Sequence, residues 1–375
     1  MNARLGFLVD GHGCSCALPG RSGELAIRSA LGGYKVVFRR AGEGFRQING
    51  LAGEGAFFLI DGAVLRLHRK RLKLPVSRVL AVKAGEQLKT LAGVKKIFSF
   101  LNKNNFTRAD RLVIIGGGTV QDSGGFAAAC YKRGVRWTFA PTTLLSMCDS
   151  CIGAKTGVNF ERAKNQLGVF YAPEQVIVEP DFLLTLPACH VRSGLGEILK
   201  LAVTGGPAAL GLYRRLFPAA AGGCRESLNE LVKMSLSVKK AVIELDEFEK
   251  HYRKTLNYGH TVGHALETLS RYKISHGLAI AMGMAAANEL AVSRGLLAPD
   301  DCAELNRLCV LLADRGLPSL VPAHLLALLK KDKKAGRNGL TLALCAKAGD
   351  LRLVTVKPDL ALAREIVAAL KNNFR

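Results

Sequence analysis

Three histidines and one glutamate have the side-chain types and spacing of a metal site. His260 and His264 lie four residues apart in RKTLNYGHTVGHALE, so a helix would place both on one side. His276 follows one short turn-like segment later, and Glu197 stands upstream in SGLGEILKLAV. One carboxylate and two imidazoles from three separate helices would form an open three-ligand site for zinc or a similar divalent ion, with one coordination position left for substrate.

The histidine spacing has a second interpretation. Pairs at i and i+4 on Ala- and Leu-rich helices also occur as caps or as polar pairs within a core. The sequence has no HExxH motif, because Thr261 stands where that motif would place its glutamate. Lys200 follows Glu197 by three residues and would share its helical face. The metal hypothesis therefore depends on the residues that accompany the histidines.

The overall composition is typical of an α/β enzyme. The 375 residues suffice for two domains with separate cores, 49% of them are apolar, and 40 are glycine. No apolar run approaches the roughly 18 residues of a membrane span, and the N-terminus lacks the apolar run of a secretory signal. The ten cysteines are scattered and are predicted to be reduced thiols. We therefore expect a cytoplasmic protein without a membrane partner.

The formal net charge of +23 is the one property that points toward polyanions. A basic surface attracts nucleic acid, anionic membrane and anionic substrate alike. The densest cluster, RLHRKRLK at residues 66–73, is not interleaved with the aromatic residues that single-strand binding uses. We interpret it as a solvated basic face and do not expect a nucleic-acid partner.

Short apolar runs separated by helical stretches predict parallel βαβ units in the first half of the chain. The runs are KVVF, FFLI, VLAV and RLVII, and residues 89–102 are predicted to form a crossover helix. The last run ends in Gly116-Gly117-Gly118, with a helix predicted to begin near Asp122. Backbone amides and a helix N-terminus bind phosphate in such an arrangement, and a tight turn without a ligand is the alternative.

After about residue 185 the pattern becomes helical. Predicted helices at 192–203 and 228–244, the histidine helix and a helix at 276–294 follow one another without a strand between them. LTLALCAKAGDLRLVTV predicts a small hairpin that turns at Gly349-Asp350, as an edge addition. We therefore predict an α/β domain over residues 31–185 and a mainly helical domain over 186–375. Residues 1–30 show no periodic pattern and are assigned to a possible loosely ordered extension.

Five motifs in order resemble 3-dehydroquinate synthase and its sugar-phosphate cyclase relatives. They are GGGTVQD, PTTLLSMCDSCIGAKTGVN, AKNQLGVFYAP, GLGEILK and LNYGHTVGHALE, and the resemblance extends from about Ala84 to Arg294, more loosely from Tyr34 to Val356. It implies a Rossmann-like parallel-sheet NAD domain, followed by a helical domain that binds metal and substrate. It also implies an active site in the cleft between them, a homodimer, and NAD and a divalent metal (zinc or cobalt) as cofactors.

The implied reaction converts 3-deoxy-D-arabino-heptulosonate 7-phosphate to 3-dehydroquinate with elimination of phosphate. This lyase reaction belongs to the shikimate pathway of aromatic amino acid biosynthesis. NAD would transiently oxidise a secondary alcohol, which acidifies the adjacent carbon and lets phosphate leave; reduction, ring opening and aldol closure follow. The metal would bind the hydroxyl and polarise the carbonyl. The resemblance makes Glu197, His260 and His276 the metal ligands, and it assigns His264 to substrate.

The resemblance also implies the residues that bind substrate and cofactor. For the substrate phosphate they are Lys155, Asn165, Arg133, Asn257, His264 and Lys334; for its carboxylate they are Arg253 and Lys239. Lys200 would lie close to the reacting centre. For NAD they are Asp61, Glu86, Lys89, Gly117, Gly118, Asp122, Thr142, Thr143, Asp149, Lys155 and Lys164. An anionic substrate of this kind requires several cations around it.

Four positions depart from the family pattern. GAV follows Asp61 where the family has an asparagine, and Leu278 follows His276-Gly277 where it has a glutamate, so a polar neighbour of the metal site is lost. GAKTG replaces GGKT, and Gln121 replaces a small residue. These departures keep two alternatives open: a cyclase for another sugar phosphate, and a non-catalytic basic binding protein on this scaffold. The presence of both Arg253 and Lys239 favours a substrate that carries a carboxylate.

Overall fold

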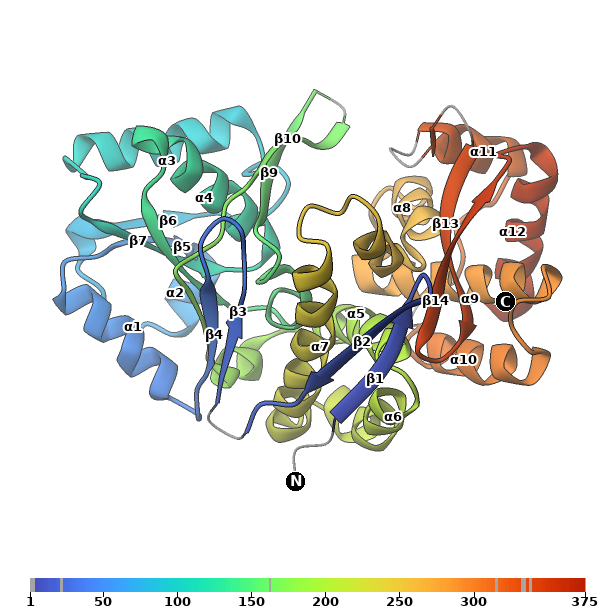
Figure 1. Ribbon diagram of the computed structural model, residues 1–375. Coiled ribbons are helices and arrows are strands. Elements are labelled where there is room, and N and C mark those ends of the chain that lie inside the picture. Colours follow the sequence, from blue (N-terminus) through green and yellow to red (C-terminus); the bar gives the residue numbers. More distant parts are fainter. Residues whose placement is uncertain are drawn as a thin grey trace. The chain divides into compact units, whose positions relative to one another are not determined.

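The computed structural model describes residues 4–20, 23–161, 163–313, 316–331, 335–336 and 339–374. The chain divides into two compact units (Figure 1). We call Pro19–Pro187 the sheet unit, and residues 4–18 together with 188–374 the helical unit. No helix in the described ranges is both long enough and apolar enough to cross a membrane.

The sheet unit is built on a seven-stranded sheet. Its strands are β3 (Glu24–Ile27), β4 (Tyr34–Phe38), β5 (Phe57–Asp61), β6 (Val79–Val82), β7 (Arg111–Gly116), β8 (Arg136–Pro141) and β11 (Gln175–Val178). Their order is β3-β4-β11-β8-β7-β5-β6, and every neighbouring pair is parallel except β3 with β4. Strands β9 (Lys155–Phe160) and β10 (Ala163–Phe170) form a separate hairpin.

The helices of the sheet unit alternate with its strands. They are α1 (Glu43–Gly53), α2 (Gly62–Leu67), α3 (Leu91–Lys103) and α4 (Gly118–Cys130), with short turns η1 (Val76–Arg78), η2 (Tyr131–Arg133), η3 (Ser146–Ser150, a π-helix) and η4 (Pro180–Thr185). The four predicted apolar runs are confirmed as β4, β5, β6 and β7, and the predicted crossover helix is α3. Helix α4 begins at Gly118 rather than near Asp122, because Gly117 takes the extended N-cap conformation before it.

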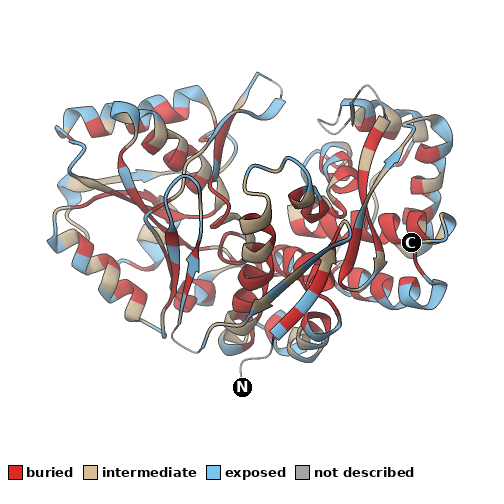
Figure 2. Cartoon of the chain, in the orientation of Figure 1, coloured by how far each residue is buried: buried red, intermediate tan, exposed pale blue. Residues whose placement is uncertain are grey.

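The parallel strands bring the carboxyl ends of β5, β7 and β8 to one edge of the sheet. Residues 112–116 of β7 are all buried, which is expected of a strand covered on both faces. Strands β5, β7 and β8 end at Asp61, Gly116 and Pro141, and the backbone N–H of Thr142 donates to the Gly116 carbonyl at 3.0 Å. This edge is where parallel α/β sheets bind their ligands. Figure 2 shows the buried residues of this unit along the strands and on the inner helix faces.

The helical unit packs its helices around a smaller sheet. The helices are α5 (Ala188–Thr204), α6 (Pro207–Ala221), α7 (Arg225–Leu245), η5 (Tyr252–Asn257), α8 (His260–Leu269), α9 (His276–Ser293), α10 (Pro299–Leu311), α11 (Pro322–Lys331) and α12 (Leu360–Asn373). The strands are β1 (Arg4–Val9), β2 (His12–Ala17), β12 (Ala335–Gly336), β13 (Gly339–Lys347) and β14 (Asp350–Val356), in the order β12-β13-β14-β1-β2. The predicted helices correspond to α5, α7, α8 and α9.

The N-terminal residues form strands, so the prediction of a loosely ordered extension over residues 1–30 is wrong. β1 pairs with β2 and with β14, and β3 joins the sheet of the other unit. Leu5, Phe7 and Val9 alternate into the core at 2%, 5% and 0% exposure. The sequence does not reveal this pairing because β14, the partner of β1, lies more than 300 residues away along the chain. The predicted hairpin forms as β13 and β14. It is not an edge addition, because β12 and β1 lie on either side of it in the five-stranded sheet.

Candidate metal and cofactor sites

Glu197, His260 and His276 converge in the helical unit from helices α5, α8 and α9. The Oε1 atom of Glu197 lies 3.5 Å from Nε2 of His260 and 3.1 Å from Nε2 of His276. One ring nitrogen each from His260, His264 and His276 lies within 4.8 Å of the other two. The structure therefore brings together the three side chains that the sequence proposes as metal ligands, and it places His264 beside them.

Glycines let the three helices approach closely enough for this contact. A Cβ atom on Gly196 would lie 2.1 Å from the carbonyl oxygen of Gly277, and one on Gly277 would lie 1.7 Å from that of Ser193. A Cβ on Gly283 would lie 2.0 Å from the carbonyl oxygen of Gly259. These distances exclude any side chain at the crossings. Gly196, Gly277 and Gly259 directly adjoin Glu197, His276 and His260, so each proposed ligand sits at a close backbone contact.

Glu197 pairs with the ammonium of Lys200, and Glu197 and Glu267 lie on either side of the His276 ring. Its Oε2 atom lies 2.6 Å from Nζ of Lys200, and both side chains are buried. Nδ1 of His276 lies 3.2 Å from Oε2 of Glu267. Burial alone would lower the pKa of His276, but hydrogen bonds and charges from Glu197 and Glu267 outweigh it and raise the pKa to about 10. In the absence of metal this position therefore holds a proton firmly, as expected where two carboxylates surround one imidazole.

The donor set fits a zinc or cobalt ion. A carboxylate oxygen and imidazole nitrogens are ligands that both metals accept, and three protein donors leave a position for substrate. Nδ1 of His260 lies 3.3 Å from the carbonyl oxygen of Tyr258, which leaves Nε2 directed toward Glu197. In both His260 and His276, the Nδ1 atom thus faces a protein acceptor, while Nε2 faces Glu197. This arrangement is common among metal-binding histidines.

The residues assigned to the substrate carboxylate lie on neighbouring elements of the helical unit. Arg253 is buried on η5, and Lys239 is buried on α7. The carboxylate of Asp246 accepts hydrogen bonds from the backbone N–H groups of Lys250, His251 and Arg253 at 2.9, 2.8 and 3.0 Å. This turn fixes the backbone that presents Arg253.

Sequence reasoning missed the acidic residues that hold this region. Besides Asp246, Oε1 of Glu249 accepts a hydrogen bond from Nδ2 of Asn257 at 2.8 Å. Glu267 was not assigned either. The acidic run DEFE ahead of Arg253 was the only available signal. The turn between β1 and β2 also contributes, because Oδ2 of Asp10 lies 3.0 Å from Nε2 of His251.

In the sheet unit one lysine links two groups of predicted binding residues. Nζ of Lys89 lies 2.6 Å from Oδ2 of Asp122 and 2.6 Å from Oδ1 of Asn165. Burial raises the pKa of Asp122, and the Lys89 charge opposes that rise. Nδ2 of Asn159 also donates to Oε2 of Glu86 at 2.6 Å. The GEQLK segment, the start of α4 and the β9–β10 hairpin are therefore joined, and the oxygen of Asn165 contacts a residue that we assigned to the cofactor.

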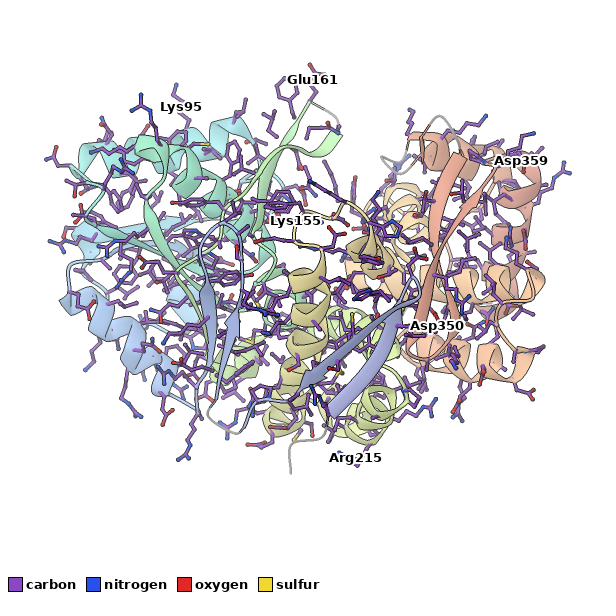
Figure 3. The ribbon with its side chains drawn as sticks, viewed as in Figure 1. Lys95, Lys155, Glu161, Arg215, Asp350 and Asp359 are labelled. Carbon is purple, nitrogen blue, oxygen red and sulfur yellow. The ribbon has the colours of Figure 1, made fainter. Side chains whose placement is uncertain are left out.

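The other predicted cofactor residues lie at the strand ends of the same unit. Gly117 caps α4, and a Cβ there would lie 2.9 Å from Cγ2 of Thr143. Asp61 ends β5, where its Oδ1 accepts a hydrogen bond from the Ala63 N–H at 2.9 Å. The remaining residues are placed as follows: Gly118 begins α4, Thr142 follows β8, Asp149 lies on η3, Lys155 begins β9 (labelled in Figure 3), Lys164 lies on β10, and Arg133 ends η2. Lys334 lies outside the described residues.

The structure shows the surroundings or the backbone of three of the residues that depart from the family pattern. Nε2 of Gln121 donates to the Ser150 carbonyl at 2.6 Å, and Oγ of Ser150 donates back to Oε1 of Gln121 at 2.6 Å. The larger side chain therefore ties α4 to η3. Leu278 is 2% exposed and belongs to the apolar core. Ala154, which replaces a glycine, keeps a left-handed φ of 57°.

Comparisons with known proteins agree with this geometry. Models of the 3-dehydroquinate synthase N-terminal and C-terminal regions match residues 79–193 and 194–335. A 3-dehydroquinate synthase from Synechococcus is 35% identical over 373 residues, covering 95% of this chain and 98% of the relative. One from Thermosynechococcus vestitus is 40% identical over 259 residues, covering 67% of this chain and 70% of the relative.

Solved structures of sugar-phosphate cyclases share the fold. A 2-deoxy-scyllo-inosose synthase, complexed with carbaglucose-6-phosphate, NAD⁺ and Co²⁺, aligns with a TM-score of 0.78 at 23% identity, covering 91% of this chain and 99% of its own. A 2-epi-5-epi-valiolone synthase from Streptomyces hygroscopicus, with NAD⁺ and Zn²⁺ bound, aligns with a TM-score of 0.74 at 28% identity, covering 92% and 98%. Near-complete coverage of a curated relative at 35% identity, together with both matched regions, shows that this chain belongs to the 3-dehydroquinate synthase family.

Proposed function

We propose that this chain cyclises 3-deoxy-D-arabino-heptulosonate 7-phosphate to 3-dehydroquinate, with elimination of phosphate, as a carbon–oxygen lyase that uses NAD and a divalent metal. Family membership supports the reaction. The observation that carries the proposal is the convergence of Glu197 Oε1 on His260 and His276, at 3.5 and 3.1 Å, within a unit that also buries Lys239 and Arg253.

Glu197, His260 and His276 would hold the metal. When bound, the metal supplies Lewis acidity to a substrate oxygen, and NAD supplies a hydride acceptor that returns the hydride later in the cycle. The ammonium group of Lys200 lies 2.6 Å from Glu197, beside the proposed metal site. During the reaction it would stabilise negative charge that develops on a substrate oxygen. Because Lys200 is buried, its charge is weakly screened by water.

Arg253 and Lys239 would bind the substrate carboxylate. A guanidinium offers two parallel donors to a carboxylate, and the Asp246 turn keeps its backbone fixed. His264 would donate a hydrogen bond to a phosphate oxygen from beside the metal ligands, and Asn257 would do the same with Glu249 orienting its amide. In the sheet unit, Lys155, Asn165 and Arg133 would supply further phosphate donors.

The strand ends of the sheet unit would bind NAD. The N-terminus of α4, with Gly117 and Gly118, offers backbone N–H groups to the pyrophosphate. Asp61 and Glu86 would accept hydrogen bonds from ribose hydroxyls. Lys89, Asp122, Thr142, Thr143, Asp149, Lys155 and Lys164 complete the proposed set. Because Gly117 has no side chain, the cofactor would be able to approach its backbone. A Cβ atom at this position would lie against Thr143 and would block that approach.

We also propose a homodimer that acts in the cytoplasm. The family resemblance supports the homodimer. Light scattering of the purified protein tests the first, because a homodimer has twice the 40.2 kDa mass of the chain. Fractionation of cells that express the chain tests the second.

The decisive test of function is phosphate release by the purified protein. The assay supplies NAD, zinc or cobalt, and the seven-carbon keto acid phosphate, and it identifies the product by mass spectrometry. We expect release that requires both cofactors and yields 3-dehydroquinate. Binding of NAD and zinc without phosphate release would instead favour another sugar-phosphate cyclase. A protein that binds neither cofactor would favour the non-catalytic alternative.

A further inference from the structure

The two proposed metal-binding histidines are held by different kinds of acceptor. Nδ1 of His276 lies 3.2 Å from the carboxylate of Glu267, whereas Nδ1 of His260 lies 3.3 Å from the backbone carbonyl of Tyr258. Glu267 stands on α8 and His276 begins α9, so the contact joins two helices. Glu267 has only 8% of its surface exposed.

The Glu267 contact dictates which nitrogen of His276 is available. An ionised carboxylate only accepts hydrogen bonds, so Nδ1 of His276 must carry the hydrogen. Its Nε2 atom, which faces Glu197 at 3.1 Å, is then the nitrogen whose proton a metal replaces, and it presents its lone pair to that metal. A carboxylate partner also increases the electron density that the ring offers, which a neutral carbonyl does less strongly.

The burial of Glu267 increases the energetic importance of its contact with His276. A carboxylate removed from water is costly unless a donor compensates it, and the His276 ring is the donor that the described contacts place at Oε2. Leu278 stands where the family has a glutamate two residues after His276, and it is buried in the apolar core. Leu278 therefore supplies no polar neighbour to His276, and the acidic neighbour that the described contacts show besides Glu197 is Glu267 on α8.

We propose that Glu267 is a positioning residue that fixes the tautomer and ring orientation of His276 and strengthens its Nε2 as a metal ligand. This inference rests on the metal site of the proposed function. It makes His276 the stronger of the two imidazole donors, because its partner is an anion while that of His260 is a backbone carbonyl.

The test measures zinc affinity by competition with a chromogenic chelator. Glu267→Gln has nearly the same shape and keeps an acceptor oxygen but removes the charge, and Glu267→Ala removes both. We expect weaker zinc binding in both variants, with a loss of about 10- to 100-fold for Glu267→Ala and a smaller one for Glu267→Gln. Should the alanine variant fail to fold, the isosteric glutamine variant still decides the question.

A second readout separates positioning from general destabilisation. In the zinc-loaded protein, the Nδ1 proton of His276 should be strongly deshielded in NMR spectra by its carboxylate acceptor, and this signal should move upfield in Glu267→Gln. Glu244→Gln is the matched control, since Glu244 is a similarly buried glutamate that contacts Lys240 on α7 instead of a histidine. It should leave both the zinc affinity and the His276 signal unchanged.

The outcomes distinguish this inference from the proposed function. Zinc affinity and a His276 signal unaltered in Glu267→Gln and Glu267→Ala would overturn the inference. Glu197→Gln tests the site itself, because it removes a proposed ligand. If Glu197→Gln binds zinc as tightly as the wild type, the metal site is misassigned and the proposed function fails with it.

Discussion

The Nζ atom of Lys200 lies 2.6 Å from Oε2 of Glu197, with 4% and 2% of the two side chains exposed. Water solvates neither charge of an ion pair that is buried this deeply, so each charge depends on the other to offset its desolvation cost. A divalent ion held by Glu197 would provide a second source of positive charge at the same carboxylate. The pair therefore links the stability of the metal-free chain to the electrostatics of the proposed site.

Replacing Lys200 should make stability depend on metal. Lys200→Met leaves Glu197 without its ammonium partner, so we expect the metal-free protein to lose about 3–5 kcal/mol of unfolding free energy. Added zinc should restore more stability to this variant than to the wild type, because zinc binds the native state and supplies the missing charge. Denaturant unfolding with and without zinc measures both quantities. Lys233→Met, which removes a buried lysine paired with Glu230, is the control that zinc should not restore. Equal effects of zinc on all three proteins would contradict this prediction.

The glycine crossings should be essential to the metal site. Gly196→Ala would place a methyl group 2.1 Å from the Gly277 carbonyl oxygen, so α5 and α9 must separate. We expect a loss of about 3 kcal/mol in stability, together with weaker zinc binding. Gly211→Ala is the control: Gly211 lies within α6, and its Cβ would meet nothing within 4 Å, so about 1 kcal/mol of stabilisation is expected. Unaltered zinc affinity in Gly196→Ala would contradict this prediction, because it would show that zinc binding does not require the close contact of α5 with α9.

Much of the fold follows from local sequence patterns. The strands β4 to β7 contain short apolar runs, of which those in β5 and β7 are buried. The histidine helix and the glutamate helix are recognisable from composition and spacing. The candidate metal site could be proposed because the five motifs around His260, His276 and Glu197 favour metal ligands over a capping or core role for the histidine pair. Local patterns fail where the partner is remote in sequence. The residues of β1 alternate in burial in the structure, but the partner strand β14 lies at the other end of the chain.

The residues that support the site could not be predicted for the same reason. Glu267 looks like an ordinary helical glutamate, and only the crossing of α8 and α9 brings it to His276. Gly196 and Gly277 are unremarkable until the backbones that they face are known. Asp246 gains its role from three backbone N–H groups, which a sequence does not display.

Arg253 should determine recognition of the substrate carboxylate. Arg253→Ala should reduce kcat/KM for the seven-carbon keto acid phosphate by about 100-fold, because a charge-assisted contact contributes roughly 3 kcal/mol. An analogue without the carboxylate should be affected much less. Lys254→Ala, at the exposed neighbouring position, is the control and should behave as wild type. Circular dichroism establishes that the variants are folded. Equal losses on both substrates would contradict the carboxylate assignment.

Asp246 should make stability fall at acid pH. Burial would raise its pKa, but hydrogen bonds from the backbone of His251, Lys250 and Arg253 and the Arg253 charge outweigh burial and lower the pKa below 3.8. A carboxyl with a lowered folded-state pKa stabilises the protein above its ordinary pKa, and this contribution is lost as the pH falls through the lowered value. Asp246→Asn should therefore cost about 1 kcal/mol at neutral pH, after allowance for partial solvent screening, and the difference from wild type should shrink below pH 3.8. Urea unfolding across this pH range measures the difference, with the exposed Asp300→Asn as control. A difference that stays constant with pH would mean that the Asp246 charge contributes nothing to the turn that presents Arg253.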